Sequence, residues 1–323
     1  MALAFAVTNG FHDAANAIAT LVATRAARPV QAVALASACT LLGPLVLGAA
    51  VAETVAGVIS VPRASLVPVV GAALSGAVGW NLFTWALGLP SSSSHALVGG
   101  LAGAALAQAG PGAVRWTGDG GLGFAGVLVG LAISPVLGAG AAGLLELGLR
   151  RRLGRASARI GPVVLRAQWA TSAVLALAHG ANDAQKTVGL VAVLAFASGA
   201  EASRHPPAWA VPAVALALTV GTALGGWSIV RTIGRRILRL RPLDALASQS
   251  GSAAVIALAS ALGAPVSTSQ VVASSVVGAG LGKRRARRIR WHVVRQIALA
   301  WVTTVPAAGL VAAASLPVWR WLA

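Results

Sequence analysis

Charged residues, acidic residues and cysteine are all scarce in this sequence. Only 10% of its 323 residues are charged, seven are acidic, and a single cysteine, Cys39, excludes an internal disulfide. Soluble domains carry about 25% charged residues, so this chain cannot cover a surface that faces water. Hydrophobic residues make up 57% of the chain, and the mean hydropathy is +0.81. The composition predicts an integral membrane protein with helical spans, because lipid offers no partner to loose backbone groups.

The charge that is present is strongly basic. The chain has 25 Lys and Arg residues and a formal net charge of +18, an excess that in a soluble protein would indicate nucleic-acid binding. Here the basic residues lie between apolar runs, so we expect a cytoplasmic surface beside anionic lipid and no nucleic-acid partner. The basic clusters are Arg25 with Arg28, 150–166, 231–241 and 283–295, and the loops poor in basic residues are 52–63, 110–120 and 200–207.

Two polar motifs occur twice, in the same order. The segment Asn9–Asn16 (NGFHDAAN) aligns with His179–Lys186 (HGANDAQK), with Asp183 lying 170 residues after Asp13. The segment Gly88–His95 (GLPSSSSH) aligns with Gly263–Gln270 (GAPVSTSQ) at an offset of 175 residues. Two motifs at a nearly constant offset indicate an internal duplication, and we expect the extra residues of the second half near 201–207.

The duplication and the basic clusters together predict the topology. With every basic cluster inside, each half crosses the membrane five times, so the second half is inverted relative to the first. We predict an all-α membrane protein with about ten transmembrane segments, in two inverted repeats with broken or re-entrant helices, as in secondary transporters. We expect the first repeat at 1–149, a basic cytoplasmic loop at 150–166 and the second repeat at 167–323. The expected segments are 1–24, 29–51, 64–89, 91–109 and 121–149, then 167–199, 208–230, 243–262, 265–282 and 291–320.

The first motif places a carboxylate at membrane depth in each half. Asp13 and Asp183 each cost ~2.5–3.5 kcal/mol on insertion scales, and their equivalent positions favour a cation or proton site, with interhelical ion pairing as the alternative. Both are candidate sodium ligands. Neighbouring amides would supply the neutral oxygens that a hard cation prefers, or serve as hydrogen bonds between helices. These amides are Asn9, Asn16, Asn182 and Gln185, and the histidines that can relay protons or pack as polar groups are His12, His95 and His179.

The second motif predicts a site for an anion. In each half a run of hydroxyl residues precedes an apolar segment, and free N–H groups at a helix start bind anions. Close helix packing is the alternative explanation for such small residues. Lys186 stands where the first half has Asn16, so it is expected to pair with Asp183, three residues earlier, or to touch the anion. The candidate anion ligands are Ser92, Ser93, Ser94, Ser267, Thr268, Ser269 and Lys186.

At these motifs the chain resembles the inorganic phosphate transporter (PiT) family, over essentially its whole length. The motifs that carry the resemblance are NGFHDAANAIAT, HGANDAQKTVGL, GLPSSSSHALVGG and GAPVSTSQVVASSVVGAG. The GANDAQK form is similar to the bacterial low-affinity branch, which is associated with proton-driven uptake of phosphate, often as a neutral metal–phosphate complex. The resemblance implies that the two Asp residues and their amides serve the coupling cation and that the hydroxyl residues serve phosphate. One departure is Gln270, because the second hairpin of the family usually carries His there.

We therefore expect a secondary active importer of inorganic phosphate in the plasma membrane, working by ion-coupled symport. Protons are the expected driving ion, with at most one sodium site, at Asp13 and Asn16, and with magnesium as an optional passenger. The alternatives are a sulfate permease of the same family, a sodium-coupled phosphate symporter and, less favoured, a passive anion channel or a structural membrane protein. No nucleophile–base pair stands out, so we expect neither an enzyme nor a resident cofactor, and a homodimer stays open.

Overall fold

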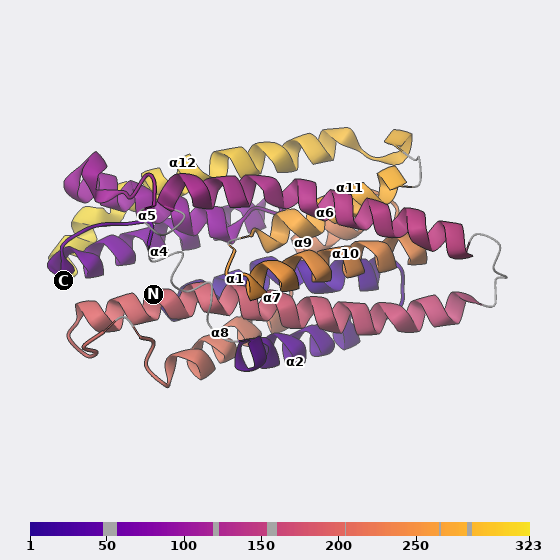
Figure 1. Ribbon diagram of the computed structural model, residues 1–323, viewed down its shortest axis with the longest axis horizontal. Coiled ribbons are helices and arrows are strands. Elements are labelled where there is room, and N and C mark those ends of the chain that lie inside the picture. The colour runs from indigo at the N-terminus through magenta and orange to yellow at the C-terminus, as the bar shows by residue number, and fades with distance from the viewer. Residues whose placement is uncertain (48–56, 119–122, 154–159, 204, 265, 283–285) are drawn as a thin grey trace.

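The structure, a computed structural model, is an elongated bundle whose helices run along a common axis (Figure 1). It describes residues 1–47, 57–118, 123–153, 160–203, 205–264, 266–282 and 286–323. The helices are α1 (Ala2–Ala23), α2 (Pro29–Leu47), α4 (Arg63–Ala86), α5 (Ser93–Ala109), α6 (Gly123–Leu153), α7 (Gly161–Ala197), α8 (Ala210–Leu224), α9 (Trp227–Arg231), α10 (Pro242–Ala261), α11 (Thr268–Gly282) and α12 (Trp291–Leu322), with short helical turns η1 (Pro111–Ala113), η3 (Thr232–Arg236) and η4 (Ala286–Arg288).

The expected all-α membrane fold is confirmed. Within the described residues, the only strand-like feature is one isolated antiparallel bridge, between Ile59 and Val114. Four helices (α2, α4, α6 and α12) are each long and apolar enough to cross a membrane, and the bent pair formed by α8 with residues 227–236 is a fifth candidate. Of the others, α5 and α11 are short, α1 and α7 carry the polar motifs, and α10, with 20 residues, is not apolar enough. The count of ten transmembrane segments therefore stays a prediction.

Helix boundaries differ from the expected segments in two places. The segment expected at 208–230 is broken, with a bend of 58° between α8 and α9. The break lies at Gly225, whose φ of +67° is favoured only for glycine, and at Gly226, where a Cβ would overlap the backbone of α1. The basic loop expected at 150–166 is also shorter, because α6 continues to Leu153 and α7 begins at Gly161. Residues 154–159, like 48–51 and 121–122 of two expected segments, lie outside the described part of the chain.

The two halves of the chain pack reciprocally against each other. Helix α1 packs on α8 while α7 packs on α2, and α5 packs on α12 while α11 packs on α6. Close approach is possible because glycines face each other at the crossings. A Cβ added at Gly10 or at Gly221 would overlap the backbone of the partner helix, α8 or α1 respectively. This packing brings the polar motifs of the two halves into contact.

Two helical hairpins, α4–α5 and α10–α11, turn back near the middle of the bundle. Gly88 and Gly263 end the first helix of each hairpin with φ of +66°, and serine hydroxyls begin the second helix. The Ser92 hydroxyl accepts a hydrogen bond from the backbone N–H of His95 (3.2 Å), and the Ser267 hydroxyl accepts one from Gln270 (3.3 Å). We call residues 91–94 and 266–269 the two hairpin tips.

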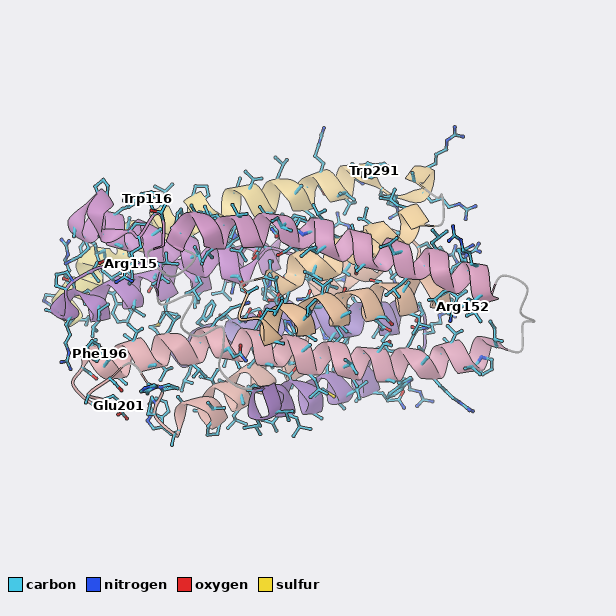
Figure 2. The ribbon with its side chains drawn as sticks, in the orientation of Figure 1. Arg115, Trp116, Arg152, Phe196, Glu201 and Trp291 are labelled. Carbon is cyan, nitrogen blue, oxygen red and sulfur yellow. The ribbon has the colours of Figure 1, made fainter. Side chains whose placement is uncertain are left out.

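The two ends of the bundle differ in character. Figure 2 places Arg152 and Trp291 at one end, and Arg115, Phe196 and Glu201 at the other. The first end carries the segments with most of the arginines, so we call it the arginine-rich end. Between the ends, many leucines and valines on the outer faces of the helices are exposed, as expected for contact with lipid.

Candidate functional site

Two buried carboxylates lie close together at the centre of the bundle. Asp13 of α1 is 1% exposed and Asp183 of α7 is 0% exposed. One oxygen of each carboxylate and one ring nitrogen of His179 all lie within 4.8 Å of one another. Two like charges at this separation in a buried setting repel strongly. The arrangement therefore favours binding of a proton or a metal cation between them.

Asp13 accepts hydrogen bonds from both hairpin tips. The hydroxyl of Ser93, in the first tip, donates to Oδ2 at 3.2 Å, and the hydroxyl of Ser269, in the second tip, donates to Oδ1 at 2.7 Å. The Nδ1 atom of His12 lies 3.0 Å from Oδ1. Because the two tips come from different halves of the chain, Asp13 is a point at which both hairpins are fixed to α1.

Asp183 has different partners. Its Oδ1 accepts a hydrogen bond from Nζ of Lys186 at 2.9 Å, so the expected pairing of these residues is present. Its Oδ2 accepts a hydrogen bond from the side-chain amide of Asn9 at 3.1 Å and lies 3.6 Å from Nε2 of His179. Asn9 belongs to the first half of the chain, so this contact, like those of Asp13, crosses between halves.

The hairpin tips also touch each other and Lys186. The hydroxyl of Ser267 donates to the hydroxyl of Ser92 at 2.8 Å, and Nζ of Lys186 donates to the hydroxyl of Ser94 at 2.7 Å. Helices α5 and α11 both begin here, so their N-terminal partial positive charges point at the same place. An ammonium, several hydroxyls and two helix starts form a group of donors suited to a tetrahedral oxyanion.

The remaining predicted site residues are buried nearby with different roles. The Asn16 amide lies 3.5 Å from the Ser269 hydroxyl, whereas the Asn182 amide donates to the hydroxyl of Ser260 of α10 at 2.9 Å. Thr268 begins α11 and Gln185 lies on α7, both almost fully buried. The structure thus gathers both carboxylates, Asn9, Lys186 and the tip serines into one network, with Asn182 at its edge.

Three buried amide oxygens near this network have no hydrogen-bond donor among the described residues. They belong to Asn9, Asn182 and Gln270. A buried acceptor without a donor costs about 1–3 kcal/mol, so oxygens left in this state at a polar site fit ligands for a hard cation. His179 contributes nitrogen, which hard cations bind less readily, and it fits better as a proton carrier.

Thr84 belongs to the site but was not predicted, and Ser91, which begins the predicted serine run, was not named among the anion ligands. Nε2 of His12 lies 3.2 Å from the hydroxyl of each, and the two hydroxyls lie 2.8 Å apart. This network supports the His12 ring, which in turn contacts Asp13. Thr84 lies in a largely apolar run and gave no signal in the sequence, whereas Ser91 directly follows Pro90 and begins the serine run.

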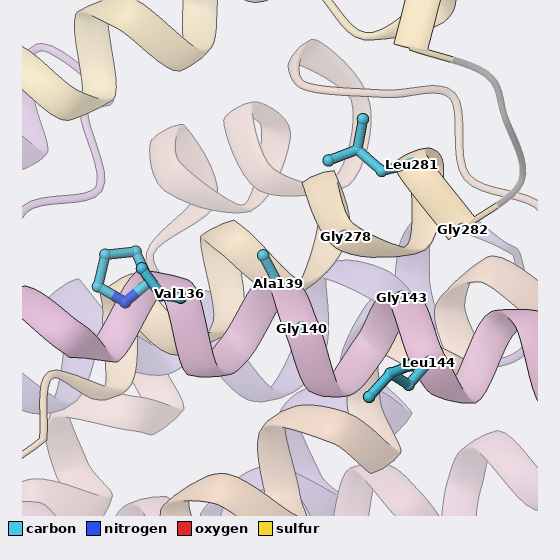
Figure 3. A pocket seen from close by; sticks show the side chains of 9 residues that line it. Val136, Ala139, Gly140, Gly143, Leu144, Gly278, Leu281 and Gly282 are labelled. Atoms are coloured by element: carbon cyan, nitrogen blue, oxygen red, sulfur yellow. The ribbon is translucent and has the colours of Figure 1, made fainter.

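A wide surface groove is distinct from this site. It has a volume of about 620 Å³ and lies on the outer face of the bundle, between α6 and α11 (Figure 3). Its lining is glycine and apolar side chains, such as Val136, Leu144 and Leu281, which offer nothing to an ion. The central network, in contrast, is closed: none of its side chains is more than 7% exposed.

Known proteins are similar to this chain over most of its length. The profile described as "Phosphate transporter family" matches residues 9–164 and 149–312. Several proteins named probable low-affinity inorganic phosphate transporters are similar to this chain over nearly its whole length. Those of Mycobacterium tuberculosis (strain ATCC 25618 / H37Rv) and Rhizobium meliloti are each 41% identical over 97% of this chain. The matched region covers 74% of the first protein and 92% of the second. The Bacillus subtilis protein of that name is 36% identical over 94% of this chain and 91% of its own.

One solved structure has the same fold. It is titled "The sodium-dependent phosphate transporter", has a TM-score of 0.86 and covers 100% of this chain and 98% of its own. At 24% identity the likeness is one of fold. The arrangement of broken helices described above is therefore shared with a protein of known architecture.

Proposed function

This chain belongs to the phosphate transporter family, and on that premise we propose that it imports inorganic phosphate by symport with a coupling ion, chiefly the proton. Members of a transporter family are not enzymes, and the chain is a multi-pass membrane protein. The observation that carries the proposal is that both hairpin tips donate hydrogen bonds to Asp13, while Lys186 joins Asp183 to Ser94 of the first tip. It puts donors for an anion beside acceptors for a cation in one closed site.

Phosphate is assigned to the hairpin tips. The helix starts of α5 and α11 and the Lys186 ammonium provide positive potential, and the tip hydroxyls provide hydrogen bonds. Phosphate keeps a proton near neutral pH and can therefore donate a hydrogen bond to a carboxylate such as Asp13. Sulfate has no proton at this pH and cannot donate one. This difference favours phosphate over the sulfate alternative. The proposed ligands are Ser92, Ser93, Ser94, Ser267, Thr268, Ser269 and Lys186.

The proton is assigned to the carboxylate pair. The Lys186 ammonium, 2.9 Å from Asp183, opposes a second cation there. A proton needs no coordination shell, and His12 and His179 stand next to the carboxylates as carriers. The proposed coupling residues are Asp13, Asp183, Asn9, Asn16, Asn182 and Gln185.

Sodium coupling is the second candidate, and one observation favours it. The amide oxygens of Asn9, Asn182 and Gln270 without donors resemble the ligands of a hard cation. A sodium ion would bind best on the Asp13 side, near Asn16, where no ammonium is bonded to the carboxylate. Transport of phosphate as a magnesium complex remains a separate prediction.

The transport cycle follows from the internal duplication. We propose two inverted repeats, 1–149 and 167–323, that rock about the central site, with the arginine-rich end facing the cytoplasm of a cell-membrane protein. The reciprocal packing of α1 on α8 and of α7 on α2 supports this division. The homodimer stays an expectation.

Uptake into proteoliposomes tests the proposal. Radiolabelled phosphate uptake is measured with an inward proton gradient alone, with an inward sodium gradient alone, and with neither, using sulfate and arsenate as competitors. We expect accumulation above equilibrium with the proton gradient, competition by arsenate and little competition by sulfate. Accumulation that requires sodium and does not depend on pH would show that sodium, not the proton, is the coupling ion. Equilibration without accumulation under either gradient would show that the protein is a passive channel.

A further inference from the structure

A second polar cavity lies at the arginine-rich end of the bundle, apart from the central site. Its volume is about 380 Å³. Arg239 and Arg241, in the segment before α10, line it together with Arg288 of η4, and Asp244 of the first turn of α10 completes its polar lining. The remaining lining residues are Leu238 and Leu240. None of these residues belongs to the phosphate or coupling site proposed above.

The two segments that carry the arginines are held together. The backbone N–H of Arg290 donates to the carbonyl of Ile237 at 3.0 Å, which joins the segment after η4 to the segment before α10. Ile289 and Leu238 are buried in the same apolar cluster, and both would contact a Cβ placed at Gly280 of α11. The backbone positions that present the guanidinium groups are therefore fixed before any ligand arrives, which lowers the entropic cost of binding.

The arginines of this cavity lack carboxylate partners within the described part of the chain. The four ion pairs found there involve other residues. Asp244 is already engaged, because its Oδ2 accepts a hydrogen bond from the backbone N–H of Arg241 at 2.9 Å and its side chain contacts Glu146 of α6. Glu146 in turn accepts from Nε of Arg150 at 2.6 Å. The cavity is thus lined by three arginines and by one carboxylate, Asp244, which already has hydrogen-bond partners. Its net charge is positive.

The positive charge of this end is larger than the chain can balance. Only seven acidic residues stand against 25 basic ones in the whole sequence. The positive-inside rule explains why arginines gather at a cytoplasmic face, but it does not explain why three of them, from two segments, line one recessed cavity. A guanidinium group is planar, and two of its N–H groups can donate parallel hydrogen bonds to two oxygens of one phosphate.

We propose that this cavity binds a phosphate group from the cytoplasmic side. Its source is either the headgroup of an anionic phospholipid or a soluble phosphate compound. Both share the tetrahedral anion that guanidinium groups bind, and both can reach the three exposed arginines that line the cavity. The ligand is a phosphate group that the protein holds without transporting it.

The test uses the full-length protein in phosphatidylcholine nanodiscs. In the soluble arm, pyrophosphate binding is measured by calorimetry. In the lipid arm, the thermal unfolding midpoint is compared between phosphatidylcholine nanodiscs and nanodiscs that also contain phosphatidylglycerol. The test variant is the double substitution Arg239→Gln with Arg288→Gln. The matched control, Arg235→Gln with Arg287→Gln, removes the same charge from exposed residues of η3 and η4 that do not line the cavity.

In at least one arm, the wild type and the control should respond alike, and the test variant should bind at least about tenfold more weakly or lose the lipid-dependent shift in unfolding midpoint. A response in the soluble arm alone identifies a soluble ligand, and a response in the lipid arm alone identifies a headgroup. Equal loss in both double variants would reduce the effect to general surface charge and overturn the proposal. So would the absence of any response in the wild type. If the double variants fail to fold, Arg288→Gln and Arg287→Gln are compared in the same way.

Discussion

Replacing Lys186 by Asn tests whether this ammonium keeps sodium away from Asp183. Its Nζ lies 2.9 Å from Asp183 Oδ1 and 2.7 Å from the Ser94 hydroxyl. A sodium ion bound to Asp183 would lie about 4 Å from the ammonium, where two unit charges repel by about 4 kcal/mol at an effective dielectric constant of ~20. This energy corresponds to roughly a thousandfold loss of sodium affinity. Asn removes the charge and offers an amide oxygen, as Asn16 does at the equivalent position.

We expect sodium to stimulate phosphate uptake by Lys186→Asn at least about tenfold, which lies within the roughly thousandfold change estimated for sodium affinity. The wild type should respond chiefly to the pH gradient. Initial uptake rates are measured in proteoliposomes at fixed pH, with sodium exchanged for choline. Lys186→Arg, which keeps the charge, is the control and should behave as the wild type does.

Two results would refute this reasoning. One is strong sodium dependence in the wild type with no effect of pH, and the other is a Lys186→Asn protein that stays folded and insensitive to sodium. Folding has to be measured in parallel, because removing one partner of a buried ion pair costs about 3–5 kcal/mol. An unfolding midpoint taken with and without sodium serves both purposes, since a bound ion stabilises the folded state.

Three further predictions follow from the contacts. Asp13→Asn and Asp183→Asn should each abolish accumulation of phosphate while leaving the protein inserted; normal accumulation in either variant would show that its carboxylate is dispensable. Ser93→Ala and Thr268→Ala should each raise the half-saturating phosphate concentration by about tenfold or more, since a hydrogen bond to a charged group contributes ~1.5–3 kcal/mol, and a change below threefold in both would exclude the hairpin tips. Gly221→Ala places a methyl group on the backbone of α1 and should lower the unfolding midpoint in detergent; an unchanged midpoint would mean that the α1–α8 crossing can widen freely.

The sequence predicts the helices and the site well where local signals exist. Hydropathy and the repeated motifs locate nearly every helix, and the rarity of buried carboxylates singles out Asp13 and Asp183. The break between α8 and α9 was missed because Gly225 and Gly226 lie among many glycines, and only contact with α1 shows which of them bend the chain. The His12–Thr84 contact was missed because hydroxyl groups in apolar helices usually bond to their own backbone, as Thr84 also does.

The hydrogen bonds between side chains of the two halves cannot be predicted from local sequence patterns. Periodicity puts Asn9 and Asp13 on one face of α1, which favours their acting together, yet the Asn9 amide serves Asp183. Asn182, next to Asp183 in sequence, turns to Ser260 instead. Which partner each amide takes depends on how the two repeats interlock, and that is a property of tertiary packing.

This interlocking makes the two carboxylates unequal as coupling groups, although the repeat makes them equivalent in sequence. Asp183 and Lys186 lie three residues apart on α7, so their bond survives any movement of α7 as a rigid body. Asp13 receives its donors from Ser93 and Ser269, in tips that belong to different halves. When the tips separate to open the site, Asp13 loses at least one hydrogen bond, worth ~1.5–3 kcal/mol to its charged form. The donors around Asp13 therefore differ between the open and the closed site. A group can couple ion binding to movement only if its affinity differs between the two states, so we expect the movement to act on the carboxylate pair mainly through the contacts of Asp13, while Asp183 keeps its bond to Lys186.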